Sequence, residues 1–152
     1  MTQANTHTIQ TLQIQSKTEL LADMRTFVSE AARDFGFAES DVGKIELAID
    51  EACTNIIKHA YRYNPDGIIE VRLSTQRDDA LIKFIVEIFD SGLSFDSSHY
   101  TAPDMTEYFR KLRHGGLGIV LMRKLMDEVA FGPAVGGRNT IRLVKYLPAS
   151  SA

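Results

Sequence analysis

The sequence predicts a two-layer α/β sandwich, a mixed and mostly antiparallel sheet with helices packed together on one face. Two observations lead to this fold class. Hydrophobic periodicity gives the order strand, two helices, two strands, a long aperiodic segment, a helix and two strands. No internal repeat or linker interrupts the 152 residues, a length typical of one domain. We therefore expect a single domain over residues 1–152, with 1–7 and 148–152 as flexible tails.

An edge strand and a long helix are expected first. Polar and apolar residues alternate imperfectly over residues 8–15, because the two isoleucines fall on opposite faces of a strand. Ser16 is expected to cap a helix over residues 17–35, which Gly36 ends. The apolar side chains of this helix recur at helical spacing: Leu20, Met24, Phe27, and Ala31 or Ala32.

A second long helix is predicted to start at Ser40 or Asp41 and to continue to about Tyr61. The Asn-Pro-Asp-Gly cluster at residues 64–67 then forces a turn. The inward stripe of this helix consists of Ile45, Ile49, Ala52, Cys53, Ile56 and Ala60.

Two strands joined by a hairpin are expected next. Residues 69–73 alternate apolar and charged, whereas residues 81–89 are almost continuously apolar, as in a central strand covered on at least one face. The polar segment at residues 76–79 suggests the hairpin turn.

The last third of the chain begins with a segment, residues 91–114, that has no periodicity. A loop of this length within a compact domain is usually functional, often a lid. A third helix is predicted to open at Gly118, and residues 139–147 form the last strand. The inward side chains of the third helix are expected to be Ile119, Met122, Leu125 or Met126, and Val129.

Composition excludes several classes of protein. The net charge of −3, from 17 basic and 20 acidic residues, argues against direct nucleic-acid binding through a broad basic surface. One cysteine provides neither a disulfide framework nor a cysteine-based zinc site. The polar N-terminus lacks the apolar core of a signal peptide, and no apolar run approaches the length that crosses a bilayer. We expect a cytoplasmic protein without a membrane partner.

A carboxylate and a carboxamide lie four residues apart on the second helix. Glu51 and Asn55 therefore share one helix face, away from the apolar stripe. The carboxylate can abstract a proton, and the carboxamide oxygen suits a hard cation such as Mg²⁺. Taken alone, the pair is better explained as part of a solvated polar face.

Two further motifs combine glycine with a position at the end of an element. Asp90-Ser91-Gly92 ends the most apolar strand, where a carboxylate can accept a hydrogen bond from a ligand amine and glycine allows close approach; a simple turn is the alternative. The Gly-Gly-Leu-Gly run at residues 115–118 precedes a helix, and the free N–H groups of a helix start can bind phosphate. The alternative is a loop whose glycines only make the helix start sterically easy. No P-loop motif occurs, and no βαβ unit surrounds the glycines, which argues against a Rossmann site.

These motifs, in this order, resemble those of a known superfamily. Glu-Ala-Cys-Thr-Asn at residues 51–55 resembles the N-box of the gyrase, histidine kinase and MutL ATPases, the Bergerat fold. Asp90-Ser91-Gly92 resembles their first glycine box and residues 115–118 their second. More narrowly, residues 48–61 and 115–129 are very similar to the RsbW-like anti-sigma-factor serine/threonine kinases, and the resemblance spans roughly residues 8–147.

The resemblance implies a role for each matching residue. Glu51 would be the general base for a substrate serine hydroxyl, and Asn55 would ligate Mg²⁺ on the ATP phosphates. Asp90 would accept the adenine amino group, and Gly92 would shape that pocket. The remaining matches are the phosphate-facing Gly115, Gly116 and Gly118, and Thr140, which would support the adenine-side network.

Three positions qualify the resemblance. Ser94 stands where the first glycine box usually has its second glycine, which leaves the backbone path of the lid open. Lys58 matches a lysine of histidine kinase N-boxes and either touches a phosphate or lies in solvent. Arg25 falls where family members direct an arginine to their protein partner; a solvated arginine is the alternative.

The resemblance therefore implies an ATP- and Mg²⁺-dependent protein kinase in a partner-switching system. It would phosphorylate a STAS-type anti-sigma factor antagonist, or instead sequester a sigma factor, and would work as a homodimer. One alternative is an ATP-dependent binding module with little or no kinase activity, although Glu51 argues against it. Another is the catalytic domain of a sensor histidine kinase, which the absence of a dimerisation helix with a phospho-accepting histidine disfavours.

Overall fold

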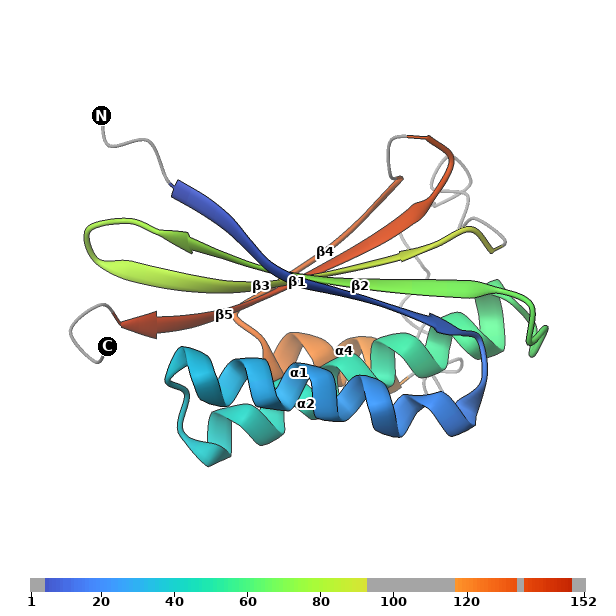
Figure 1. The fold of residues 1–152 in the computed structure, drawn as a ribbon, viewed down its shortest axis with the longest axis horizontal. Coiled ribbons are helices and arrows are strands. Elements are labelled where there is room, and N and C mark those ends of the chain that lie inside the picture. The colour runs from blue at the N-terminus through green and yellow to red at the C-terminus, as the bar shows by residue number, and fades with distance from the viewer. Residues whose placement is uncertain (1–4, 93–116, 134–135, 149–152) are drawn as a thin grey trace.

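The computed structural model describes residues 5–92, 117–133 and 136–148 and confirms the predicted fold class. Five strands form one sheet in the order β1-β2-β3-β5-β4, and each neighbouring pair is antiparallel. The helices lie together on one face of this sheet (Figure 1). The strands are β1 (Asn5–Gln15), β2 (Ile68–Arg77), β3 (Leu81–Asp90), β4 (Glu128–Pro133) and β5 (Asn139–Pro148). The helices are α1 (Leu21–Phe35), α2 (Glu39–Asn55) and α4 (Leu117–Leu125), with a 3-10 turn at Thr18–Leu20 and a π-helical turn at Ile56–Ala60.

The hydrophobic core fills the space between the helices and one face of the sheet. Alternate residues of β3 point into it, because successive side chains of a strand lie on opposite faces. The central helix α2 packs against both α1 and α4. Fully buried members of the core include Met24, Val28, Ile45, Ile49, Cys53, Phe84, Ile88 and Leu143. Within the described part of the chain, no helix is long and apolar enough to span a membrane.

The edge strand is confirmed, and its imperfect alternation has a structural cause. β1 pairs only with β2 in the sheet order, and its register shifts between Thr8 and Gln10. An irregularity of this kind offsets the alternation by one residue. The helix that follows begins differently from expectation: Lys17 is the cap residue of the 3-10 turn, and no side chain caps it.

Ser16 does not cap the helix, because its backbone is held by the loop that precedes β2. Its N–H donates to the Gly67 carbonyl at 2.8 Å, and its hydroxyl is buried without a partner among the described residues. Gly36 ends α1 as predicted, with a φ of 115° in the left-handed region.

The ends of the other two helices also differ in detail. The second helix finishes in the π-helical turn, after which Arg62 and Tyr63 adopt φ values of 48° and 63°. The third helix is shorter than predicted, since it ends at Leu125 and Val129 belongs to β4. Strand pairing of Val129 with Leu143 explains this difference, because the sheet satisfies the backbone that a longer helix would use.

Candidate functional site

Two of the predicted motifs meet where α4 begins. A Cβ built on Gly118 would lie 2.8 Å from Asn55 Nδ2 and 3.0 Å from Glu51 Oε2. Both side chains project from the same face of α2 toward α4, as their spacing predicts. The absence of a side chain at residue 118 therefore lets the carboxylate and the carboxamide reach the first turn of α4, where N–H groups lack helical partners.

A third motif places a buried carboxylate at the end of β3. Asp90 is only 3% exposed. Its Oδ1 accepts hydrogen bonds from the Gly92 N–H at 3.0 Å and from Asn139 Nδ2 at 2.9 Å. Among the described residues both of these bonds use Oδ1, which leaves Oδ2 to accept a hydrogen bond from a ligand amine.

The residue beside Asp90 is Asn139 and not Thr140. In the β3–β5 ladder Asp90 is opposite Asn139, whereas Thr140 is opposite Phe89. Paired residues share a face and neighbours alternate, so Thr140 lies on the outer face of the sheet, away from Asp90 and the helices. The resemblance matches Thr140 to a residue of the adenine-side network, but the register places Asn139, and not Thr140, beside Asp90.

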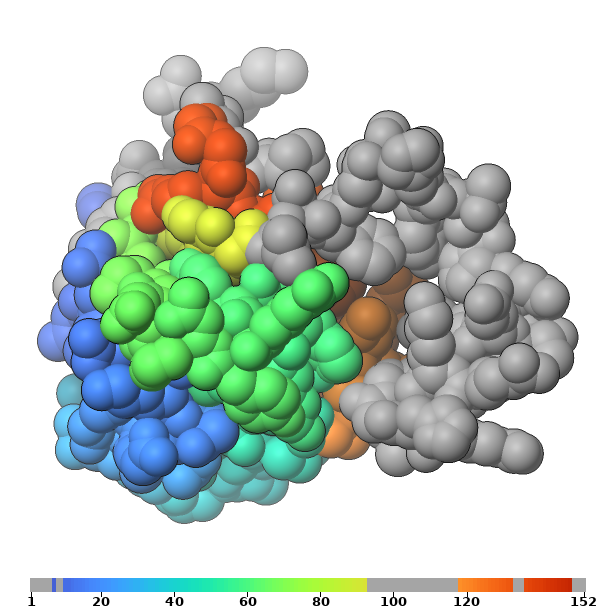
Figure 2. All heavy atoms as spheres, turned by 90° about the vertical axis from the view of Figure 1, so that its right-hand side faces the viewer, coloured from blue at the N-terminus to red at the C-terminus, as the bar shows by residue number. Residues whose placement is uncertain are grey.

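The first glycine box packs directly on the end of the second helical segment. A Cβ on Gly92 would lie 2.6 Å from the carbonyl carbon and oxygen of Ala60, so the two backbones are in contact. Figure 2 views this end of the molecule and shows the end of β3, in yellow, between the green segment that precedes β2 and the red start of β5. The close approach explains the need for glycine at residue 92.

The predicted place of Cys53 in the core is confirmed. It is fully buried, and burial raises the pKa of its thiol far above the ordinary value, with the charges of Asp50 and Asp90 adding to the effect. The thiol is therefore neutral and packs as a small apolar group.

The two basic residues singled out by the sequence lie at different places. Lys58 is exposed on the π-helical turn. Arg25 Nη1 forms an ion pair with Asp50 Oδ1 at 2.7 Å, which joins α1 to α2, while its side chain stays 37% exposed. Arg25 is thus held against Asp50 of α2, and its side chain remains accessible to solvent. Gly115, Gly116 and Ser94 lie outside the described residues.

The donor set fits a magnesium ion that is shared with phosphates. Within residues 5–92, 117–133 and 136–148 no cluster of three or more His, Cys, Asp or Glu side chains could hold a metal on its own. Mg²⁺ is usually bound through one or two protein oxygens together with substrate phosphates and water. A single carboxamide, that of Asn55, next to the start of α4 at Gly118 agrees with that mode of binding.

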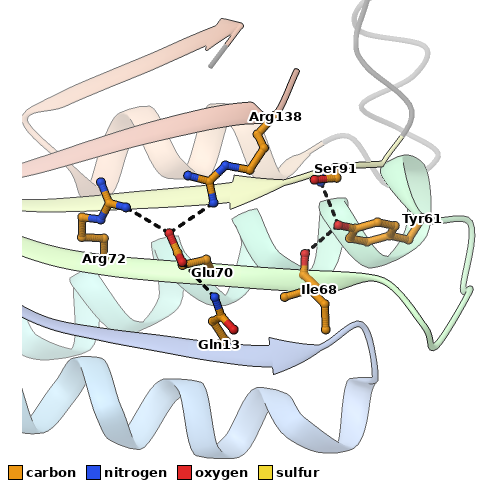
Figure 3. Close-up of polar contacts among 7 residues, drawn as sticks. All are labelled: Gln13, Tyr61, Ile68, Glu70, Arg72, Ser91 and Arg138. Carbon is orange, nitrogen blue, oxygen red and sulfur yellow. Dashed lines mark hydrogen bonds and ion pairs between the residues drawn. The ribbon is translucent and has the colours of Figure 1, made fainter. Parts of the chain in front are cut away.

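Two residues of this region were not found from the sequence. Asn139 is placed by strand register, which has no local signature in the sequence, and the sequence marks Tyr61 only as the end of the second helix. The Tyr61 hydroxyl accepts a hydrogen bond from the Ser91 N–H at 2.8 Å and donates one to the Ile68 carbonyl at 2.6 Å (Figure 3). Tyrosine before a turn that contains glycine is the one signal that could have suggested it.

The fold, with a buried aspartate at a strand end and a glycine at a helix start, agrees with the class of ATPase domains that the sequence resembles. Comparison with family models agrees: the histidine kinase-like ATPase domain model matches residues 14–145. The chain belongs to this family.

Within the family, the chain is similar to serine-protein kinases named RsbW. The protein from Bacillus velezensis is 32% identical over 143 residues, covering 90% of this chain and 84% of the relative. The protein from Bacillus cereus strain Q1 is 30% identical over 140 residues, covering 90% of this chain and 83% of the relative.

Solved structures share the fold. A chain of the SiaB–SiaC complex from Pseudomonas aeruginosa matches with a TM-score of 0.63 at 14% identity, over 90% of this chain and 89% of that one. The structure of the RsbU and RsbW domains of Rv1364c from Mycobacterium tuberculosis matches with a TM-score of 0.61 at 18% identity, over 93% of this chain and 34% of that one.

Proposed function

We propose that the chain is an ATP-dependent serine/threonine protein kinase of a partner-switching system. The observation that carries the proposal is the meeting of Glu51 and Asn55 at Gly118, with the buried Asp90 at the end of β3. Similarity to serine-protein kinases over nine-tenths of the chain supports it.

Each part of this arrangement has a chemical task. Glu51 accepts the proton of a serine or threonine hydroxyl as that oxygen attacks the terminal phosphorus of ATP, with ADP as the leaving group. Asn55 offers its carboxamide oxygen to Mg²⁺, which neutralises phosphate charge when it is bound. Asp90 accepts a hydrogen bond from the adenine amino group, and the start of α4 at Gly118 faces the phosphates.

The partners follow from the same proposal. The substrate is a small STAS-type anti-sigma factor antagonist, and the alternative partner is a sigma factor, held by a homodimer of this chain. Arg25 is the candidate contact with these proteins, because it stays partly exposed while Asp50 fixes its direction. A fixed guanidinium loses less side-chain freedom on binding than a mobile one.

The test is transfer of radiolabelled phosphate from ATP to the cognate STAS-type protein. We expect Mg²⁺-dependent transfer and an acid-stable product, as for phosphoserine or phosphothreonine. An acid-labile product would indicate histidine kinase chemistry. Stable, nucleotide-dependent binding of the matched partner without transfer would contradict the kinase proposal and favour a binding module.

A further inference from the structure

The hydroxyl of Tyr61 lies between the ends of two strands. The β2–β3 ladder ends at the pair Ile69 and Asp90, so the next pair would be Ile68 opposite Ser91. At that position the phenol oxygen accepts the Ser91 N–H at 2.8 Å and donates to the Ile68 carbonyl at 2.6 Å (Figure 3). One side chain therefore bridges the donor and the acceptor at the point where direct pairing stops.

The local backbone is built to hold this ring. A Cβ on Gly67 would lie 2.5 Å from Tyr61 Cδ1, so the ring packs on the backbone of Gly67. The two residues after Tyr61, Arg62 and Tyr63, both adopt left-handed φ values, which are unfavourable for side chains of this size. The preceding turn is π-helical, a feature that is frequent at functional sites. Backbone strain of this kind persists where the surroundings fix it.

The bridge acts on the peptide that follows Asp90. The Ser91 N–H belongs to the peptide bond that joins it to Asp90, and the next N–H, of Gly92, donates to Asp90 Oδ1 at 3.0 Å. Gly92 in turn rests on the backbone of Ala60, the neighbour of Tyr61. The Tyr61 hydroxyl therefore holds the backbone at Ser91, and with it the adjacent Gly92 N–H. This N–H is one of the two described donors to the Asp90 carboxylate; the other is Asn139 Nδ2.

We propose that Tyr61 is a positioning residue for recognition of the nucleotide base. It acts through Ser91 and Gly92 on Asp90. This inference rests on the proposed function, because it assumes that Asp90 accepts the adenine amino group. A residue with only a structural role would change stability, whereas a positioning residue changes the preference between adenine and guanine.

The test is Tyr61→Phe, which removes the hydroxyl and keeps the ring on Gly67. The dissociation constants of Mg·ADP and Mg·GDP are measured by calorimetry. We expect ADP binding to weaken about five- to tenfold, the equivalent of one lost hydrogen bond, with GDP binding unchanged. The matched control is Tyr63→Phe, at an aromatic residue that is 62% exposed, and it should keep the ADP/GDP ratio of the unaltered protein.

A second variant tests the position of the Tyr61 ring without removing its hydroxyl. Gly67→Ala keeps the Tyr61 hydroxyl but pushes against its ring, and it should also raise the ratio of the ADP dissociation constant to the GDP dissociation constant. An unchanged ratio in folded Tyr61→Phe protein, even with a lower melting temperature, would overturn the role of Tyr61. An unaltered protein that shows no preference for ADP would instead contradict the proposed nucleotide site itself.

Discussion

Gly118 is the residue at which the start of α4 meets the α2 side chains Glu51 and Asn55. Any larger side chain would contact the ends of Asn55 and Glu51, at 2.8 Å and 3.0 Å from a Cβ. These ends are flexible, so the substitution displaces the functional groups more than it disturbs the core. Function and stability should therefore respond in opposite directions to a change at this residue.

We predict that Gly118→Ala lowers phosphoryl transfer at least tenfold while the protein stays as stable or becomes more so. Alanine is favoured over glycine within a helix by about 0.5–1 kcal/mol, whereas displacement of Glu51 and Asn55 misplaces the reacting groups. Label transfer and thermal unfolding of the same preparation measure both effects. Full activity in Gly118→Ala would show that this close approach is unimportant.

Asp90 offers a second test at the level of one side chain. We predict that Asp90→Asn weakens ADP binding about 10- to 100-fold, because hydrogen bonds to a charged acceptor are the stronger ones. GDP binding and binding of inorganic triphosphate should hardly change. Calorimetry with the three ligands distinguishes base recognition from a general loss of the site, and equal affinity for ADP before and after substitution would count against the assignment.

Among the strands, the Glu70 carboxylate joins three segments on the outer face of the sheet (Figure 3). It accepts from Gln13 of β1 at 3.0 Å, and from Arg72 of β2 and Arg138 next to β5 at 3.2 and 3.3 Å. Both guanidinium groups also lie over the Phe89 ring, with Cζ at 4.7 and 4.5 Å from its centroid. This cluster fixes the start of β5, and so the residue beside Asp90.

The hydrogen bond from Gln13, followed by the contacts with Arg138 and Arg72, holds the pKa of Glu70 below its ordinary value. A lowered pKa in the folded state stabilises the protein above the pKa of the unfolded chain, and this contribution disappears as the pH falls through the folded value.

We predict that Glu70→Gln loses about 1 kcal/mol of unfolding free energy at neutral pH, since both guanidinium groups are partly exposed. The difference from the unaltered protein should shrink below about pH 4. Urea unfolding across this range checks both statements, and a difference that does not vary with pH would show that the charge of Glu70 contributes nothing.

The sequence predicts the order of the elements because each has its own periodicity, and some also end at a glycine, as α1 does at Gly36. It fails where a partner far along the chain decides the outcome. Ser16 has the chemistry of a cap, yet Gly67 holds its backbone in the loop. Val129 suits a helix, yet pairing with Leu143 places it in a strand.

In the candidate site, too, local patterns predict some positions, whereas partners far along the chain determine others. Glu51 and Asn55 share a helix face by spacing alone, and this prediction is confirmed by their common contact with Gly118. The motif resemblance points to Thr140, whereas the register places Asn139 opposite Asp90, because a one-residue step along a strand exchanges the two faces of the sheet. The bridge of Tyr61 depends on two strand ends meeting, which no local pattern encodes.

For the whole molecule, the functional consequence of the fold is that distant segments meet at one place. Glu51 of α2 and Gly118 of α4 are 67 positions apart in the sequence, yet they are neighbours. The end of β3 meets the segment after α2, because Gly92 packs on the backbone of Ala60. The described helices lie on one face of the sheet (Figure 1), so the core holds α2 and α4 side by side, and their ends near Asn55 and Gly118 form part of the candidate site.

The most direct test of the kinase proposal separates binding from chemistry at Glu51. Glu51→Ala and unaltered protein are compared for Mg·ATP affinity by calorimetry and for label transfer to the matched STAS-type partner. We predict affinity within about twofold and transfer at least about 100-fold slower, because the general base is lost while the contacts to the nucleotide remain. Unchanged transfer in Glu51→Ala would contradict the account.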